Sequence, residues 1–467
     1  MNLTKKNGLF YGIIFGVTFL FVLLGEGEIG YVMGGDTEAY YLNFHHHIGV
    51  APGYPLFIHL IEIFFGERFY LHIVAFLQIL FLAASVTFLV FTVQTLLKLV
   101  AWEAVIVWGF SMLPFVMLLP EDPIGHVLMT ESLTYPLFYV FMAVVFRAIA
   151  SKRERDFVWP ALLAMLMTWI RPQMLFAFAV VGIAYFYIQL VKRMREGKQP
   201  WKNRWYFRTA ICFAIVLLLI KAVSGLTAVY EKVFFDAPAL DYSDQTLVQR
   251  LLFLSAEEDA ELFEGREKEI FEETWERMQE AGTTDKYFDK NWKSWSEIFK
   301  AFGANSRILG DVIRNQLAEE EILAKDTIGE EIQVAEISHE LTMKLLKKHW
   351  PQHLELTAQL LPKSFISTAF FHKVRIYDLL LLATILVYLY CLIGSVLLFK
   401  RGEKSRMAAE WMLLVLLTSC INAVACDLIL CGLQRYMAYT LGMTWIGVFL
   451  ISREIFSIWR RGRKVWK

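Results

Sequence analysis

Long apolar runs, separated by short charged segments, are the feature that most limits how this chain can fold. A helix needs about 20 apolar residues to cross a hydrocarbon core about 30 Å thick. Hydrophobic residues make up 57% of the chain and charged residues 20%, whereas soluble domains carry roughly 45–50% and 25%. Because a globular core cannot bury this excess, the sequence predicts an all-α, polytopic transmembrane helical bundle.

The apolar runs predict about ten membrane spans. The longer runs lie at 8–25, 69–97, 102–119, 132–149, 172–191, 209–226, 375–399, 407–430 and 436–453. The run 157–170 is short and is followed by Arg171 and Pro172. Proline removes a backbone donor and disfavours helix in the residue before it. We therefore expect a short tenth span that turns at Pro172.

Lysine and arginine are concentrated in the loops on one side of these spans. They occur at 5–6, 98, 152–155, 192–208, 400–406 and 460–464. The positive-inside rule makes this side cytoplasmic, with both termini inside. No lysine or arginine occurs between Glu26 and Glu67, which places that loop outside. The short basic loops are typical of a multi-pass protein of the bacterial inner membrane.

The segment 227–374 differs in composition from its surroundings. It is rich in Glu, Lys and Trp, and its apolar residues recur at helical spacing among charged ones. We expect an N-terminal transmembrane module at 1–226, an extracytoplasmic helical domain at 227–374, and a C-terminal transmembrane module with a basic cytoplasmic tail at 375–467.

Net charge and cysteine usage exclude several classes of protein. Lys and Arg total 46, as do Asp and Glu, so the overall charge gives no reason to expect a nucleic-acid partner. The five cysteines lack CxxC spacing, which argues against a zinc knuckle or a disulfide framework and favours buried thiols. They are Cys212, Cys391, Cys420, Cys426 and Cys431.

Polar residues collect on the predicted outer face. Ionisable residues near or inside a bilayer are costly, so their positions are informative. The set comprises Asp36, Glu38, Tyr40, Tyr41, His45, His46, His47, Glu131, Arg171, Lys221, Asp427 and Arg435. These residues are scattered in the sequence, but the predicted topology gives them one face of the membrane.

Several of these residues belong to motifs whose order resembles the GT-C glycosyltransferases. The motifs are Asp36 followed by aromatic residues, PGYPLF at 52–57, TES at 130–132, RP at 171–172 and RY at 435–436. More narrowly, the chain resembles bacterial membrane enzymes related to protein mannosyltransferases and lipid A aminoarabinose transferases. The resemblance covers most of 1–226 and 370–455. It implies a sugar donor on polyprenyl phosphate, an outward-facing active site and inversion at the anomeric carbon.

The resemblance places Asp36 at the position of the catalytic acidic residue. A hydroxyl nucleophile needs a base within about 3 Å to take its proton during attack. The alternative is a turn carboxylate, because Gly34, Gly35 and Asp36 also suit a turn. Glu131 is either a second catalytic acid or a hydrogen-bond acceptor at a helix start, where the dipole favours acids.

Cations on the outer face are candidates for binding the donor phosphate. A guanidinium suits phosphate because it binds through two parallel hydrogen bonds, so Arg435 and Arg171 are the main candidates and Lys221 is the third. The alternatives are snorkelling to the interface or, for the arginines, pairing with Asp427. Tyr40 and Tyr41 could stack on the sugar or bond to it.

Metal binding is a weaker interpretation of the first outer loop. Asp36 and Glu38 form a D-x-E pair that could hold a divalent cation, although the sequence shows no further ligands and requires no cofactor. Adjacent histidines rarely aim at one ion. We therefore expect His45, His46 and His47 to bond to sugar or phosphate, or simply to be polar residues at the interface.

These observations predict a cell-envelope glycosyltransferase. It would transfer a monosaccharide from a polyprenyl-phosphate donor in the lipid bilayer to a glycan, lipid or protein acceptor. The alternative enzyme is a polysaccharide polymerase or ligase that uses a polyprenyl-diphosphate donor. The alternative from another class is a lipid flippase or transporter, which should show inverted repeats and polar residues near the bilayer midplane.

Overall fold

The computed structural model describes residues 5–25, 30–33, 37, 51–118, 123–195, 205–237, 242–371 and 376–465. Within these ranges the secondary structure is helical, with one isolated bridge between Val32 and Val127 and no strand. The apolar helices are α1 (Lys5–Leu24), α2 (Gly53–Phe65), α3 (Tyr70–Leu97), α4 (Ala101–Leu118), α5 (Thr130–Ser151), α6 (Val158–Ile170), α7 (Phe176–Arg195), α8 (Trp205–Phe235), α13 (Tyr377–Phe399), α14 (Glu403–Ile429) and α16 (Leu441–Val465). The remaining α-helices are α9 (Tyr242–Leu254), α10 (Gly265–Ala281), α11 (Trp295–Glu319), α12 (Thr327–Ala369) and the short α15 (Gln434–Met437).

Eight of the described helices are long and apolar enough to cross a membrane. They are α3, α4, α5, α7, α8, α13, α14 and α16 with the short turns that continue some of them. The apolar runs therefore predicted the position of each of these helices. Two further predicted spans correspond to α1, whose apolar part is the shorter stretch Gly8–Leu24, and to α6. At 1.5 Å per residue, the 13 residues of α6 reach only about 20 Å.

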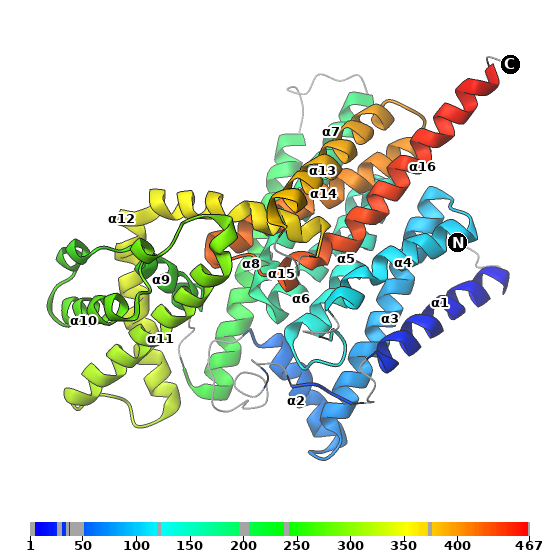
Figure 1. Cartoon of the computed structure of the whole chain (residues 1–467). Helices are drawn as coiled ribbons and strands as arrows, with labels where there is room; N and C mark the ends of the chain where they lie inside the picture. The colour runs from blue at the N-terminus through cyan, green and yellow to red at the C-terminus, as the bar shows by residue number, and fades with distance from the viewer. Residues whose placement is uncertain are drawn as a thin grey trace.

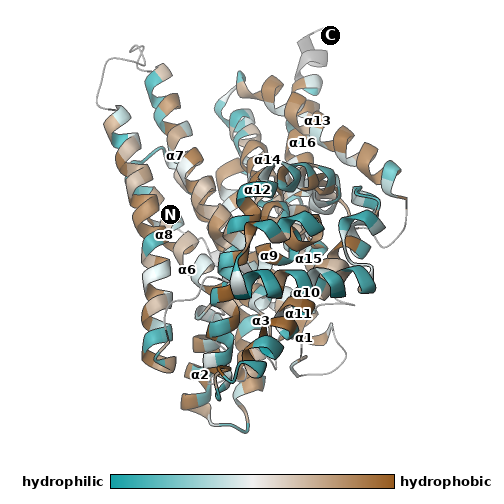
Figure 2. Cartoon of the chain, turned by 90° about the vertical axis from the view of Figure 1, so that its left-hand side faces the viewer, coloured by the Kyte–Doolittle hydropathy of each residue, from teal (hydrophilic) through white to brown (hydrophobic). Residues whose placement is uncertain are grey.

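Helices α9–α12 lie together on one side of the bundle (Figure 1). Figure 2 shows that α10 and α12 are largely hydrophilic, whereas α7 and α8 are largely hydrophobic. The α9–α12 unit has its own apolar core, which includes Leu251, Phe271, Ile313 and Leu341. A helical unit at 227–374 was predicted, although α8 continues past the predicted boundary at 226 as far as Phe235.

The predicted turn at Pro172 is confirmed. Helix α6 ends at Ile170, Arg171 is extended with φ −149° and ψ 112°, and a 3₁₀ helix follows at Pro172–Leu175. Arg171 therefore lies in the connection between α6 and α7, beyond the end of the apolar helix α6.

All five cysteines are free thiols. Cys391, Cys426 and Cys431 are buried as expected, and Cys212 is half-buried. The prediction of a buried thiol is wrong for Cys420, which is exposed on α14. An apolar surrounding in the sequence does not distinguish the inside of a bundle from its lipid-facing surface, because both favour apolar residues.

Candidate functional site

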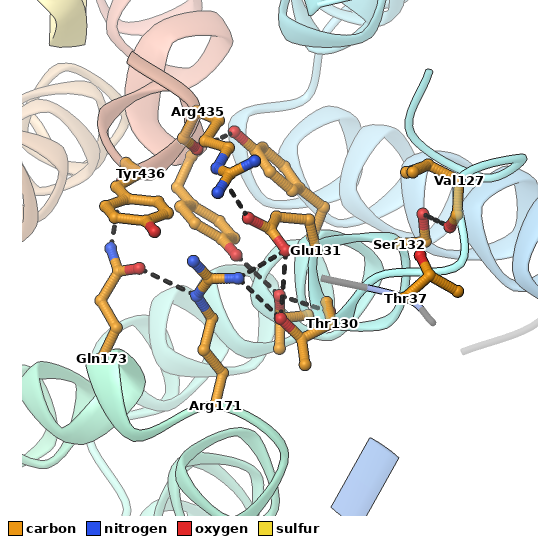
Figure 3. Close-up of polar contacts among 12 residues, drawn as sticks. Thr37, Val127, Thr130, Glu131, Ser132, Arg171, Gln173, Arg435 and Tyr436 are labelled. Atoms are coloured by element: carbon orange, nitrogen blue, oxygen red, sulfur yellow. Dashed lines mark hydrogen bonds and ion pairs between the residues drawn. The ribbon is translucent and has the colours of Figure 1, made fainter. Parts of the chain in front are cut away.

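Glu131 lies between the guanidinium groups of Arg171 and Arg435 (Figure 3). Its Oε2 is 2.5 Å from Arg171 Nη1, and its Oε1 is 3.3 Å from Arg435 Nε. The exposed fraction of the side chain is 2% for Glu131, 11% for Arg171 and 23% for Arg435. The three ionised groups therefore form a largely buried cluster that is most accessible at Arg435.

The three residues come from different parts of the chain. Glu131 is in the first turn of α5, Arg171 follows the end of α6, and Arg435 is the second residue of α15. Arg171 Nη1 also donates to Thr130 Oγ1 at 2.6 Å, so it contacts two successive residues of α5. Helix termini are where charged side chains can reach beyond the apolar bundle, which is why the cluster forms there.

A second layer of polar contacts fixes the two arginines. Arg171 Nε donates to Gln173 Oε1 at 2.9 Å, and Gln173 Nε2 donates to Asn422 Oδ1 at 3.2 Å. Asn422 Nδ2 donates to the carbonyl of Tyr436 at 2.8 Å. The guanidinium carbons of Arg171 and Arg435 lie 4.6 and 5.4 Å from the centroid of the Tyr436 ring. These contacts limit the rotamers available to both cations.

Stacked tyrosines join α5 to the segment that carries Arg435. The rings of Tyr135 and Tyr439 are 3.9 Å apart at their centroids with an interplanar angle of 12°. The Tyr439 hydroxyl lies 2.6 Å from Thr134 Oγ1, and the Tyr135 hydroxyl donates to the carbonyl of Arg435 at 2.6 Å. The backbone at Arg435 is thus held on the same helix that carries Glu131.

The connection between α1 and α2 is tied, at its described residues, to the segment that precedes α5. Val32 N donates to His126 O at 3.0 Å, and Leu128 N donates to Val32 O at 3.0 Å. Thr37, which is fully buried, donates through Oγ1 to Leu128 O at 2.7 Å. Thr37 is the residue after Asp36 in the sequence, and Leu128 is three residues before Glu131.

The structure brings together three of the predicted site residues, namely Glu131, Arg171 and Arg435. Lys221 is exposed on α8 and makes none of the cluster's hydrogen bonds or ion pairs. Asp36, Glu38, Tyr40, Tyr41, His45, His46 and His47 lie outside the described residues. Their roles stay predictions from the sequence.

Asp427 does not pair with Arg435, in contrast to the alternative that the sequence left open. Its Oδ1 accepts from the backbone N–H of Gly432 at 2.7 Å, in the turn after α14. Arg250 of α9 donates to the carbonyls of Asp427 and Leu430, and Lys363 of α12 donates to the carbonyl of Gly432. The unit α9–α12 therefore supplies cations to the carbonyls at the end of α14, where the helix dipole favours positive charge.

Sequence reasoning missed Gln173, Asn422 and Tyr436. Asn422 carried a usable signal, because a polar amide inside the apolar run 407–430 is costly unless it has a hydrogen-bond partner. Gln173 directly follows Arg171 and Pro172, so its position beside the turn was available as well. Tyr436 stood out in the sequence only as part of the RY motif at 435–436, which did not indicate that its ring would lie against both arginines.

No group of three or more His, Cys, Asp or Glu side chains suited to a metal ion occurs among the residues that the structure describes. Asp36 and Glu38 are not among those residues, so the predicted cation site is untested. In comparisons with protein-family models, curated proteins and solved structures, no match to this chain is found.

Proposed function

We propose that this protein is a membrane glycosyltransferase. It transfers a monosaccharide from a polyprenyl-phosphate donor to an acceptor hydroxyl on the outer face of the bacterial inner membrane, with inversion. The observation that carries the proposal is the convergence of Arg171 and Arg435 on the single carboxylate of Glu131 at the end of apolar helices.

The cations in this cluster are suited to an anionic ligand. Two guanidinium groups lie around one carboxylate in a largely buried setting. A phosphate oxygen is a natural partner for a guanidinium, because the hydrogen bond is charge-assisted. Arg435, the more exposed of the two, is the group that would reach the donor phosphate.

The proposed transfer step uses Asp36 as its base, as the sequence predicts, and the arginines of the cluster as its phosphate ligands. The acceptor hydroxyl gives its proton to the carboxylate of Asp36 while its oxygen attacks the anomeric carbon. The bond between that carbon and the phosphate oxygen breaks, and the electron pair leaves with the phosphate. Arg435 and Arg171 stabilise the negative charge that grows there. In this scheme Glu131 is a positioning residue, because its carboxylate holds both arginines.

The role proposed for Asp36 is supported by its sequence neighbour Thr37, which is anchored to Leu128, three residues before Glu131. The proposal also includes ten spans, with α1 and α6 completing the eight longer helices, and an extracytoplasmic position for α9–α12. Both follow from the distribution of Lys and Arg.

The direct test is binding of a polyprenyl-phosphate analogue to the purified protein. We expect Arg435→Ala to weaken binding by on the order of 2–5 kcal/mol, because it removes one partner of a partly buried charge pair. Lys221→Met is the matched control and should bind like wild type, since Lys221 is exposed on α8. Wild-type affinity in both Arg435→Ala and Arg171→Gln would remove the basis of the proposal. Tighter binding of a polyprenyl diphosphate would favour the polymerase or ligase alternative.

A further inference from the structure

A groove of about 320 Å³ lies where α5 ends and α6 begins. It is lined by Val144, Arg147, Ala148, Asp156 and Trp159. Along α5, Arg147 is 16 residues from Glu131, which corresponds to about 24 Å at 1.5 Å per residue. The groove is therefore separate from the candidate site and lies toward the opposite end of the same helix.

Arg147 is an unusual residue for its position. It is exposed one turn before the end of the apolar helix α5. Its guanidinium carbon lies 5.9 Å from the centroid of the Phe88 ring, and no carboxylate among the described residues forms an ion pair with it. A cation near the end of an apolar helix needs water or an anionic group such as phosphate to compensate its charge.

Asp156 and Trp159 lie in the connection before α6 and in the first turn of α6. Asp156 belongs to the 3₁₀ helix Glu154–Phe157, which connects α5 to α6, and its side chain is 36% exposed. Among the described residues, the cation paired with it is Arg155, with Nε 4.0 Å from Oδ1, which is too long for a hydrogen bond. Trp159, at the second position of α6, is 66% exposed. Exposed tryptophan at the end of an apolar helix is typical of the headgroup level.

We propose that this groove binds the headgroup of an aminophospholipid, a phosphodiester that carries a primary ammonium group. Arg147 lies within α5 and binds the phosphate, whereas Asp156 lies in the connection beyond the helix end and binds the ammonium. This order matches the lipid, in which the phosphate lies between the acyl chains and the amine. A carboxylate prefers a primary ammonium to a quaternary one, because only the primary group donates hydrogen bonds.

Binding to purified protein tests this proposal. The protein in detergent is equilibrated with equal amounts of phosphatidylethanolamine, phosphatidylcholine and phosphatidylglycerol of identical acyl chains, and retained lipids are counted by native mass spectrometry. We expect preferential retention of phosphatidylethanolamine. Arg147→Gln should lower that retention about ten-fold, as expected for the loss of one charge-assisted hydrogen bond. Asp156→Asn should lower phosphatidylethanolamine to the level of phosphatidylcholine and leave phosphatidylcholine unchanged.

Arg153→Gln is the matched control. It removes an exposed positive charge from the connection that follows α5, but Arg153 does not line the groove. Retention in Arg147→Gln equal to that in Arg153→Gln would overturn the proposal. So would retention of phosphatidylglycerol by the wild type at or above that of phosphatidylethanolamine, because a site for anionic lipid has no use for Asp156. Glycosyl transfer need not be measured, so the result does not depend on the proposed enzyme activity.

Discussion

The hydroxyl of Tyr135 donates a 2.6 Å hydrogen bond to the backbone carbonyl of Arg435, 300 residues away in the sequence. This bond and the stacked ring of Tyr439 fix the start of α15 against α5. The distance between Arg435 and Glu131 is therefore set by the Tyr135 hydrogen bond and the stacked tyrosine rings as well as by the ion pair itself.

Tyr135→Phe should remove the hydrogen bond that holds the backbone of Arg435 against α5, without removing a charge. We expect a loss of unfolding free energy of about 0.5–1.5 kcal/mol, the usual contribution of one hydrogen bond. Binding of the polyprenyl-phosphate analogue should weaken as well. Tyr139→Phe is the matched control, because its hydroxyl donates to the carbonyl of Ser111 at 2.8 Å, outside the cluster. Thermal unfolding and analogue binding check both variants, and equal binding defects in the two would contradict the role of Tyr135.

Asp36→Asn should abolish most transfer and leave donor binding intact. The amide keeps the size of the side chain but cannot take a proton, and a positioned base contributes roughly 10²- to 10⁴-fold to the rate. Turnover with a defined donor and acceptor is the measurement. Near-wild-type turnover would show that the assigned base is wrong.

Glu131→Gln should act mainly on stability. It leaves two guanidinium groups near each other without their carboxylate, and breaking a buried ion pair from one side costs about 3–5 kcal/mol. Thermal unfolding should show this loss, which is larger than expected for a carboxylate at an exposed helix start. Abolished transfer with wild-type stability and wild-type binding of the donor analogue would mean that Glu131, and not Asp36, carries the chemistry.

Impermeant thiol labelling can establish on which side of the membrane α9–α12 lie. In a background without the five native cysteines, a cysteine at position 303 on α11 should react from outside, whereas one at position 402 should not. Gly303 and Gly402 are both exposed, and an added Cβ meets no atom within 4 Å at either position. The reverse pattern would place α9–α12 in the cytoplasm and contradict the orientation that the basic loops predict.

The α9–α12 unit should lose stability in acid through Asp259. Burial alone would raise the pKa of this carboxyl, but hydrogen bonds from His349 and Lys348 lower the pKa from 3.8 to about 2. A carboxyl with a lowered pKa stabilises the fold above its unfolded pKa, and this contribution is lost as the pH falls from about 4 to about 2.

Asp259→Asn should therefore cost about 2 kcal/mol of unfolding free energy at pH 7 and progressively less below pH 4. Unfolding of wild type and variant, followed across this pH range, is the measurement. Asp285→Asn is a suitable control, since Asp285 pairs with Lys290 at a more exposed position. A constant difference between wild type and Asp259→Asn at all pH values would contradict the assignment.

Most of the helices could be predicted from the sequence because crossing a bilayer is a local requirement. A run of sufficient length and apolarity, such as 69–97, specifies α3 without reference to the rest of the chain. The turn at Pro172 was equally predictable, since proline acts on its own backbone and on the residue before it.

Contacts between distant residues were decided only by the tertiary structure. The sequence offered Asp427 as a partner for Arg435 and Lys221 as a third donor-binding cation. Instead, packing turned Asp427 toward Gly432, left Lys221 exposed on α8, and brought Glu131 between Arg171 and Arg435. The sequence showed that charges would collect where apolar helices end, because lipid excludes them from the middle. Which charges meet depends on the rotation and contacts of whole helices, and no local pattern encodes these.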